Sequence, residues 1–486
     1  MAFLIGGANS AADTGYDIDN SCRFDDAGDN NLLFQMGTPT DGKKHTVSCW
    51  VKKSRIAGGS QNIFTAEQEE GDPYDGSGIY FGGGSNDYLT YNHATAGTAY
   101  TLTSDAQYRD PSAWYHVVCH TDSTDGTAAD RMKMYVNGER VTVFSNTPTN
   151  FPEDGLPNMN MSGENHRIGI NELNDNAYSA PWDGYISEFY FIDGQALTPS
   201  SFGETNDDGI WVPIDYEGTY GDNGIRCEFK GTGTSANASG IGADTSGNTN
   251  HMTVTDLTSV DMCTDTPTNN FATLNPLWAG AEVTLSEGNC KYAGGTTSGQ
   301  GPAQACGGTF GVSNGKWYFE VTRKSNDAMV GIMSADTRIG IDNPFGSVFN
   351  GKGHAVYTSD GNARSGNANT AYGDSLADDE ILGIALDLDN DAIYYSEQGT
   401  FYHSGDPTSG GSKTGAASNF TAVDTYVLGY IADGASGASS VYEFNFGNPS
   451  HSISSGNADA NGYGNFEFAV PSGYFAPCTK NLAEYG

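Results

Sequence analysis

Basic residues are scarce in this sequence. It contains 22 Lys and Arg against 60 Asp and Glu, so the formal net charge is −38 over 486 residues. Nucleic-acid affinity depends on clustered Lys and Arg that displace counterions from phosphates, and an anionic membrane surface attracts the same side chains. The charge balance therefore disfavours both a nucleic-acid partner and an anionic membrane surface.

Long apolar runs and helical patterns are also lacking. No apolar run approaches the ~18 residues that a membrane span requires. The N-terminus has only four apolar residues in a row, with no basic region before them, unlike a signal peptide. No stretch of three or more turns repeats apolar residues at helical spacing. We therefore predict an all-β protein without membrane insertion, synthesised in a cytoplasm.

The eight cysteines form no recognisable pairs. They are scattered along the chain, with no C-x-x-C spacing and no His partners at zinc-ligand spacing. This scatter is typical of small core residues rather than of a disulfide framework. We predict that these thiols are mostly reduced and buried.

Strand patterns and hairpin turns are abundant. In residues 316–322, Trp317, Phe319 and Val321 alternate with more polar residues, as in a strand with two unlike faces. Residues 131–141 place Asn137-Gly138 between alternating runs, the strongest short-range hairpin signal. A second hairpin is predicted around a polar turn at residues 389–391. Short strands with frequent turn signals favour a β-sandwich.

The chain divides into unlike segments. Strand patterns are dense in residues 1–205 and again in residues 276–486, whereas residues 206–275 are rich in Gly, Ser, Thr, Asn and Asp. Such a composition is typical of a connector with little core of its own. The sequence thus predicts two antiparallel, jelly-roll-like β-sandwich domains joined by a polar connector.

Each half resembles a known β-sandwich family. Four motifs in the first half occur in the order of the laminin-G/pentraxin-like concanavalin A superfamily: 47–52, 114–118, 132–141 and 184–199. The second half resembles a SPRY domain at residues 315–321, 330–332, 382–389 and 441–447. Together the two resemblances cover about three quarters of the chain.

The combination of a lectin-like jelly roll with a SPRY domain resembles proteins of marine tailed bacteriophages. This resemblance implies a virion surface protein, either a tail fibre that binds a host-surface glycan or receptor or, alternatively, a head-decoration protein. It also implies contacts with other virion proteins and a homo-oligomer, for which a trimer is suggested by analogy with phage fibres. A host-side SPRY adaptor is a weaker alternative, because it leaves the lectin-like half unexplained.

Carbohydrate binding uses aromatic faces that stack on sugar rings, together with carboxylate and amide hydrogen bonds from loops. Two segments offer these residue types. The candidate ligand-binding residues are Tyr74, Asp75, Asp87, Tyr88 and Tyr91 in the first half and Phe345 and Phe349 in the second. The alternative is that alternating tyrosines simply cover the faces of a sheet.

No catalytic residue or cofactor is predicted. Glucanases of the superfamily carry an E-x-D-x-x-E strand, and the nearest match is residues 70–75. Asp75 replaces the last Glu there, and Pro73 cannot donate to a strand ladder, so a polysaccharide hydrolase is the weaker hypothesis. A Ca²⁺ ion is compatible with the family but is not placed by the sequence. Its candidate loops contain Asp72 and Asp75, Asp122 and Asp125, or Asp389 and Asp391.

Overall fold

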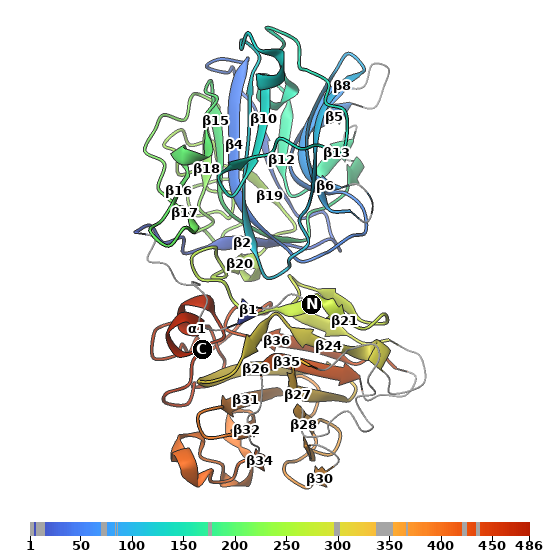
Figure 1. The fold of residues 1–486 in the computed structure, drawn as a ribbon, viewed down its shortest axis with the longest axis vertical. Coiled ribbons are helices and arrows are strands. Elements are labelled where there is room, and N and C mark those ends of the chain that lie inside the picture. The colour runs from blue at the N-terminus through green and yellow to red at the C-terminus, as the bar shows by residue number, and fades with distance from the viewer. Residues whose placement is uncertain are drawn as a thin grey trace. The chain divides into compact units, whose positions relative to one another are not determined.

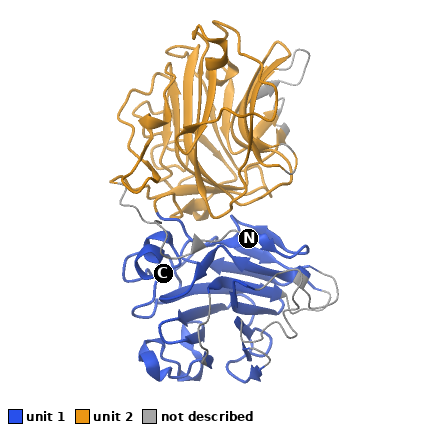
Figure 2. Cartoon of the chain, viewed as in Figure 1, with its two compact units in different colours: residues 1–11, 269–486 blue, residues 12–268 orange. Residues whose placement is uncertain are grey.

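The computed structural model describes residues 4–5, 15–69, 75–82, 84, 86–173, 177–295, 302–336, 353–365, 368–419, 425–433 and 438–486. The chain forms two compact units, residues 12–268 and residues 1–11 with 269–486 (Figure 2). We call the first the N-terminal unit and the second the C-terminal unit. Both consist of β-sheets, and the described residues contain one α-helix, α1 (Thr479–Tyr485). The predicted all-β fold class is confirmed.

The N-terminal unit is a sandwich of two sheets (Figure 1). The first sheet, sheet I, has the strand order β11 (Glu139–Arg140), β10 (Met132–Val136), β9 (Trp114–Asp122), β4 (Lys44–Lys53), β15 (Gly184–Asp193), β2 (Ser21–Phe24) and β20 (Met262–Cys263), with β18 (Ile225–Cys227) also beside β15. The second sheet, sheet II, has the order β19 (Thr253–Thr255), β3 (Asn31–Gln35), β12 (Asn165–Ile168), β5 (Gln61–Glu69), β6 (Asp75–Gly82), β7 (Tyr88–Thr95) and β8 (Thr98–Gln107). Two small hairpins accompany them, β13 (Asn171–Leu173) with β14 (Ala177–Ser179) and β16 (Gly203–Thr205) with β17 (Trp211–Pro213).

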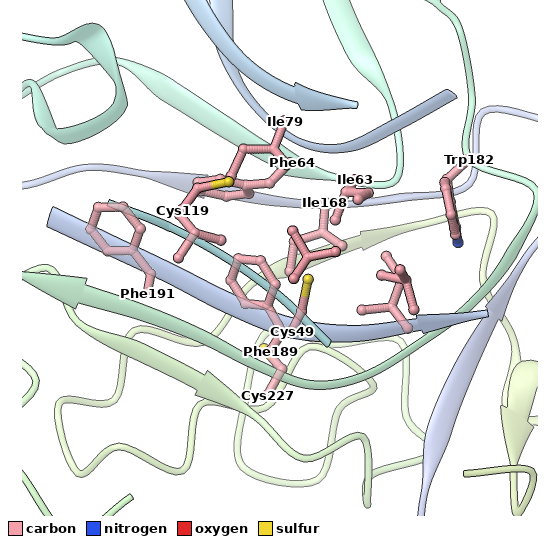
Figure 3. Close-up of a cluster of buried hydrophobic side chains, with 14 of the residues drawn as sticks. Cys49, Ile63, Phe64, Ile79, Cys119, Ile168, Trp182, Phe189, Phe191 and Cys227 are labelled. Atoms are coloured by element: carbon pink, nitrogen blue, oxygen red, sulfur yellow. The ribbon is translucent and has the colours of Figure 1, made fainter. Parts of the chain in front are cut away.

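The core of this unit lies between the two sheets. Cys49 of β4 and Phe189 of β15 come from sheet I, whereas Phe64 of β5 and Ile79 of β6 come from sheet II, and their side chains meet in one buried cluster (Figure 3). Alternate residues of a strand point to opposite faces, so each sheet presents one apolar face inward. Each fully buried side chain of this size stabilises the fold by roughly 1.5–3 kcal/mol relative to an exposed one.

Most of the segment predicted to be a polar connector, residues 206–268, belongs to this unit, whereas residues 269–275 belong to the C-terminal unit. Its strands β18, β19 and β20 extend both sheets. Five of its large apolar side chains are buried in the main core of the N-terminal unit: Ile225, Phe229, Ile241, Met252 and Leu257. The expectation of a connector with little core was wrong, because isolated apolar residues separated by polar turns still reach the interior. The carboxylate of Asp244 illustrates how those turns are held, since it accepts backbone hydrogen bonds from Arg226, Ser246 and Asn250.

The C-terminal unit also contains two sheets. One has the order β1 (Leu4–Ile5), β25 (Phe310–Val312), β35 (Tyr426–Asp433), β27 (Ala328–Ser334), β28 (Gly353–Tyr357), β29 (Ala363–Ser365) and β30 (Ala368–Thr370), with β21 (Leu274–Ala279) and β24 (Ala305–Gly308) at its side. The other has the order β22 (Thr284–Ser286), β23 (Lys291–Ala293), β36 (Val441–Asn445), β26 (Lys316–Ser325), β31 (Ile381–Asp387), β32 (Ala392–Glu397) and β33 (Thr400–Phe401), with β34 (Ser418–Asn419) beside β32. Short 3₁₀ turns occur at Ala128–Asp130 (η1), Asn158–Asn160 (η2), Pro199–Ser201 (η3), Ser259–Asp261 (η4), Pro302–Gln304 (η5), Tyr402–Ser404 (η7) and Pro407–Ser412 (η8).

Both predicted hairpins are present. Strands β31 and β32 pair antiparallel across the polar turn at residues 388–391. Strands β10 and β11 are joined by Asn137 and Gly138, whose φ angles are +49° and +83°. Positive φ at both central residues is what a type I′ turn requires. In β26, Trp317, Phe319 and Val321 lie together in the main core of the C-terminal unit, as the alternation predicted.

All eight cysteines are buried free thiols, as predicted. Burial raises the pKa of Cys306 to about 12, which keeps that thiol protonated at neutral pH. No helix among the described residues is long and apolar enough to span a membrane.

A buried polar network links the two sheets of the N-terminal unit. The Tyr91 hydroxyl on β7 lies 2.9 Å from His45 Nε2 on β4 and 2.6 Å from Thr121 Oγ1 on β9. His93 Nε2 lies 2.9 Å from both of these hydroxyl oxygens, and its Nδ1 lies 2.6 Å from Ser77 Oγ. Each of these buried side chains thus has at least one hydrogen-bond partner inside the core.

We expect acidification to destabilise the N-terminal unit through its buried histidines. Burial lowers the pKa of His93 to about 3 and that of His166 to about 4, whereas an unfolded histidine titrates near 6.5. Below about pH 6.5 the unfolded chain therefore binds more protons than the folded one, and the free energy of unfolding falls as the pH decreases. Each such histidine should lower it by about 2 kcal/mol at about pH 5.

Urea unfolding of the wild type and of His93→Gln at neutral and mildly acidic pH measures this effect. The variant should lose part of the pH dependence, whereas the control His403→Gln, at an exposed position of the C-terminal unit, should keep it. An identical pH dependence in wild type and His93→Gln would contradict the expectation.

Candidate functional site

The predicted ligand-binding residues do not form one site. Tyr74, Phe345 and Phe349 lie outside the described residues. Asp75 begins β6 and Tyr88 begins β7, but the two strands run antiparallel, with Gly82 opposite Tyr88. Asp75 and Tyr88 therefore lie at opposite ends of the strand pair, about 20 Å apart at ~3.3 Å per residue.

Tyr91 was wrongly predicted to contact a ligand. Its side chain is completely buried, and its hydroxyl belongs to the network with His45, His93 and Thr121. The ring therefore has no face available for a sugar. This outcome matches the alternative reading, in which the tyrosine packs on a sheet face.

Asp87 is also buried rather than available to a ligand. Its carboxylate lies 2.5 Å from Lys53 Nζ and 3.0 Å from Arg109 Nε, and it accepts a hydrogen bond from the backbone N–H of Ala57. Burial lowers the pKa of Lys53 despite the bond to Asp87, because a desolvated ammonium is disfavoured. The carboxylate thus neutralises a buried cation and anchors the turn before β7.

Tyr88 and Asp75 keep partly exposed side chains. Asp75 accepts a hydrogen bond from the backbone N–H of Ala96 in the β7–β8 turn. A ligand role for these two residues stays a prediction. The glucanase-like segment 70–75 falls, apart from Asp75, outside the described residues.

The candidate calcium loops hold their carboxylates in local hydrogen bonds. Asp122 accepts from Thr124 and pairs with Lys44, and Asp389 accepts from the backbone N–H of Gly315. In the part of the chain that the structure describes, no three His, Cys, Asp or Glu side chains gather in a way that could hold a metal ion. A Ca²⁺ site therefore stays unplaced.

A cavity of about 180 Å³ opens at one edge of the N-terminal sandwich, where the two sheets end at β8 and β11. Residues 141–151 cover this edge. Their backbone pairs with β8, since Asp105 N–H donates to the Val143 carbonyl at 3.1 Å and Ser145 N–H donates to that of Thr103 at 2.9 Å. The Asn146 side chain fixes the segment further by donating to the Thr101 carbonyl.

The walls of this cavity, hereafter the edge pocket, are mainly apolar. Its lining residues are Leu102, Ala128, Ala129, Met132, Lys133, Arg140, Val141, Thr142, Phe144, Pro148, Thr149, Asn150 and Phe151. Phe151 forms a rigid part of the wall, because its ring packs 5.2 Å from those of both His93 and Tyr100. The buried polar network therefore supports the pocket from behind.

Two cations border the edge pocket on the side of η1. Arg140 Nη2 donates to Asp130 Oδ1 at 2.7 Å and to the carbonyl of Ala129, a lining residue, at 3.5 Å. Lys133 Nζ lies 3.6 Å from the same Asp130 oxygen. The hydrogen bond from Arg140 lowers the pKa of Asp130, so this carboxylate remains charged and holds both cations in place.

The edge pocket has the composition of a small-molecule site: apolar walls with a few polar groups at one side. Sequence reasoning missed it, because its residues come from β8, η1, β10, β11 and the segment after them. The only local signal is the group of three basic residues, Arg131, Lys133 and Arg140, on the predicted hairpin of residues 131–141 in a chain poor in basic residues.

Comparison with known proteins supports the predicted fold of the N-terminal unit. Residues 26–201 match the family described as the concanavalin A-like lectin/glucanases superfamily, which covers about a third of the chain. This match confirms the resemblance of the first half at the level of fold. A search of curated proteins finds no match.

Several solved structures are similar to parts of the chain. A heptameric SAP-like pentraxin from Limulus polyphemus is 19% identical with a TM-score of 0.30, covering 41% of this chain and 94% of its own. A putative carbohydrate binding protein from Bacteroides ovatus is 17% identical with a TM-score of 0.35, covering 51% and 60%. The SPRY domain of human HERC1 is 12% identical with a TM-score of 0.27, covering 35% and 96%. Similarities at this level carry no argument about ligands or activity.

We expect Asp87→Asn to destabilise the N-terminal unit by about 3–5 kcal/mol, because it leaves the fully buried Lys53 without its counter-charge. Asn tolerates the left-handed backbone of position 87, where φ is +53°. The loss of stability therefore measures the effect of the missing charge and not of backbone strain. Urea unfolding measures it. The control Asp154→Asn, which removes the exposed pair with Lys43, should leave the free energy of unfolding almost unchanged. Equal effects of the two substitutions would refute the structural role of Asp87.

Proposed function

We propose that this chain is a non-enzymatic glycan-binding protein of a bacteriophage particle and that the edge pocket receives the sugar. The observation that carries the proposal is the pocket itself, which lies within the concanavalin A-like fold and places the ring of Phe144 beside hydrogen-bonding side chains. Sugar rings bind to aromatic and apolar faces through their C–H groups and to polar groups through their hydroxyls.

The phage assignment rests on the resemblance of the domain combination described above. Within it, a tail fibre or receptor-binding protein is preferred to a head-decoration protein, because the pocket provides a place for a receptor glycan. A single small pocket binds weakly, so we propose a homo-oligomer on the virion surface, in contact with other virion proteins. Linking several weak sites can raise avidity by roughly 10²–10⁴.

The absence of acids from the pocket walls supports binding without hydrolysis. Most glycosidases place two carboxyl groups on either side of the scissile bond, ~5 to 9.5 Å apart. None of the described residues that line the edge pocket is Asp or Glu. The carboxylate of Asp130, which does not line the pocket, is bound to the lining residue Arg140.

We expect Phe144→Ala to abolish adsorption of the purified protein to host cells or to a host-surface glycan, because it removes an aromatic face from the pocket. Binding is measured by pull-down on intact cells and by competition with phage adsorption. Val143→Ala is the matched control, because Val143 is the next residue along the same segment, is 65% exposed and does not line the pocket. Thermal unfolding of each variant separates lost binding from lost folding.

The same assay separates the pocket from the earlier candidate at the end of β7. If Tyr88→Ala removes adsorption while Phe144→Ala leaves it intact, the sugar binds at Tyr88 and the proposed site is wrong. If the wild-type protein neither adheres to host cells nor competes with phage, the glycan-binding proposal fails and head decoration takes its place.

Hydrolysis is tested separately by reducing-end release. We expect no release from laminarin or from a host-surface polysaccharide during prolonged incubation with the protein. Release that disappears in Asp75→Asn would instead assign a polysaccharide hydrolase and overturn the non-enzymatic proposal.

A further inference from the structure

We propose that the edge pocket selects an acidic sugar, a hexuronic acid whose carboxylate binds Lys133 and Arg140 while its ring lies against the apolar wall. This inference rests on the proposed glycan-binding function and names the class of glycan.

The charge of the pocket is opposite to that of the chain. Acidic residues outnumber basic ones by 60 to 22 in the whole sequence, yet the thirteen lining residues include two cations and no acid. The nearby Asp130 offsets one of the two charges, so Lys133, Arg140 and Asp130 together carry one net positive charge. Charge complementarity of this kind favours an anionic ligand and rejects a cationic one.

Both cations have hydrogen-bonding capacity to spare. Arg140 uses only Nη2 in its hydrogen bonds to the described residues, so Nη1 and Nε face no acceptor there. Lys133 Nζ has a single ion-pair contact in the described structure, at 3.6 Å, which is too long for a good hydrogen bond. Their side chains are 42% and 20% exposed, so an incoming carboxylate can reach both heads.

The donors of the cation cluster suit a carboxylate. A guanidinium and an ammonium both donate charge-assisted hydrogen bonds to carboxylate oxygens. Asp130 fixes Arg140 through Nη2, and Arg140 Nε or Nη1 can donate a single hydrogen bond to a ligand carboxylate, with Lys133 Nζ as a second donor. Asp130 is thus a positioning residue, which holds the cations without lining the pocket.

The apolar wall distinguishes a uronic acid from a simple anion. The accessible apolar lining residues Val141, Phe144 and Pro148 offer nothing to an inorganic phosphate or sulfate, which stays fully hydrated next to such side chains. A pyranose ring presents C–H groups to this wall and its carboxylate to the cations. The two halves of the pocket therefore match the two chemical halves of a hexuronate.

The test uses a matched pair of ligands, trigalacturonic acid and its fully methyl-esterified form, which share the sugar rings and differ in charge. Isothermal titration calorimetry of the full chain should show binding of the acid that is at least about tenfold tighter than that of the ester, as expected for charge-assisted hydrogen bonds. Equal affinities for acid and ester would overturn the inference.

Two variants assign the preference to the pocket. Arg140→Gln and Lys133→Gln should each weaken binding of the acid by about tenfold and leave binding of the ester unchanged. The control Lys230→Gln removes the same charge from an exposed side chain, 56% accessible, that follows β18 and lies outside the pocket lining. It should change neither affinity, and an equal loss in the control would mean that net charge rather than the pocket determines binding.

The outcomes separate this inference from the proposed function. Binding of both ligands with equal affinity that Phe144→Ala abolishes would keep the pocket as a glycan site and reject its selectivity for acids. Failure of both ligands to bind would reject the hexuronate, while cell adsorption decides independently whether the protein binds a glycan. Tight binding of the acid that Arg140→Gln leaves intact would place the acidic sugar elsewhere.

Discussion

The edge of the N-terminal sandwich is the constraint on which the rest of this account depends. A sheet that ends at a free strand exposes unpaired backbone N–H and C=O groups, which other chains can bind. Here β8 and β11 end the two sheets on the same side, and residues 141–151 cover that side by pairing with β8. Residues 141–151 cannot lie along the edges of both sheets at once, so the edge pocket remains between the sheets. Protection of a sheet edge and formation of the edge pocket thus have the same origin.

The interior behind the pocket contains a buried cluster of polar side chains. The network of His45, Tyr91, His93 and Thr121 joins the two sheets through hydrogen bonds rather than through packing alone. Directional hydrogen bonds of this kind fix the relative positions of the groups that they join more strictly than apolar contacts do. Because Phe151 packs on His93, the network also fixes one wall of the pocket. The wall of the edge pocket is therefore rigid where the two sheets meet, and the pocket is open where residues 141–151 pass over the sheets.

The features that the sequence predicts well are those set by neighbouring residues. The turn at Asn137 and Gly138 follows from two adjacent residues that accept positive φ, and the alternation around Trp317 follows from the period of a strand. Features set by distant residues were missed. The polar segment that contains Phe229 and Ile241 was taken for a connector, because its composition does not show that both side chains reach a core built by other strands.

The same distinction between neighbouring and distant residues applies to the candidate site. Residue type alone suggested Tyr91 and Asp87 as ligand-binding residues. Tyr91 is buried and Asp87 forms an ion pair with Lys53, and neither condition is visible in the sequence. Lys133 and Arg140 were not singled out, since their meaning depends on a pocket assembled from several segments. The local signal for this edge is the presence of three basic residues on one hairpin of a strongly acidic chain.

The central claim is that the edge pocket holds the sugar. A crystal structure of the full chain with trigalacturonic acid tests it most directly. The account predicts density for a sugar ring against Phe144, with its carboxylate on Arg140 and Lys133. Density for the sugar beside Tyr88, or on the C-terminal unit, with the edge pocket free of sugar, would contradict it.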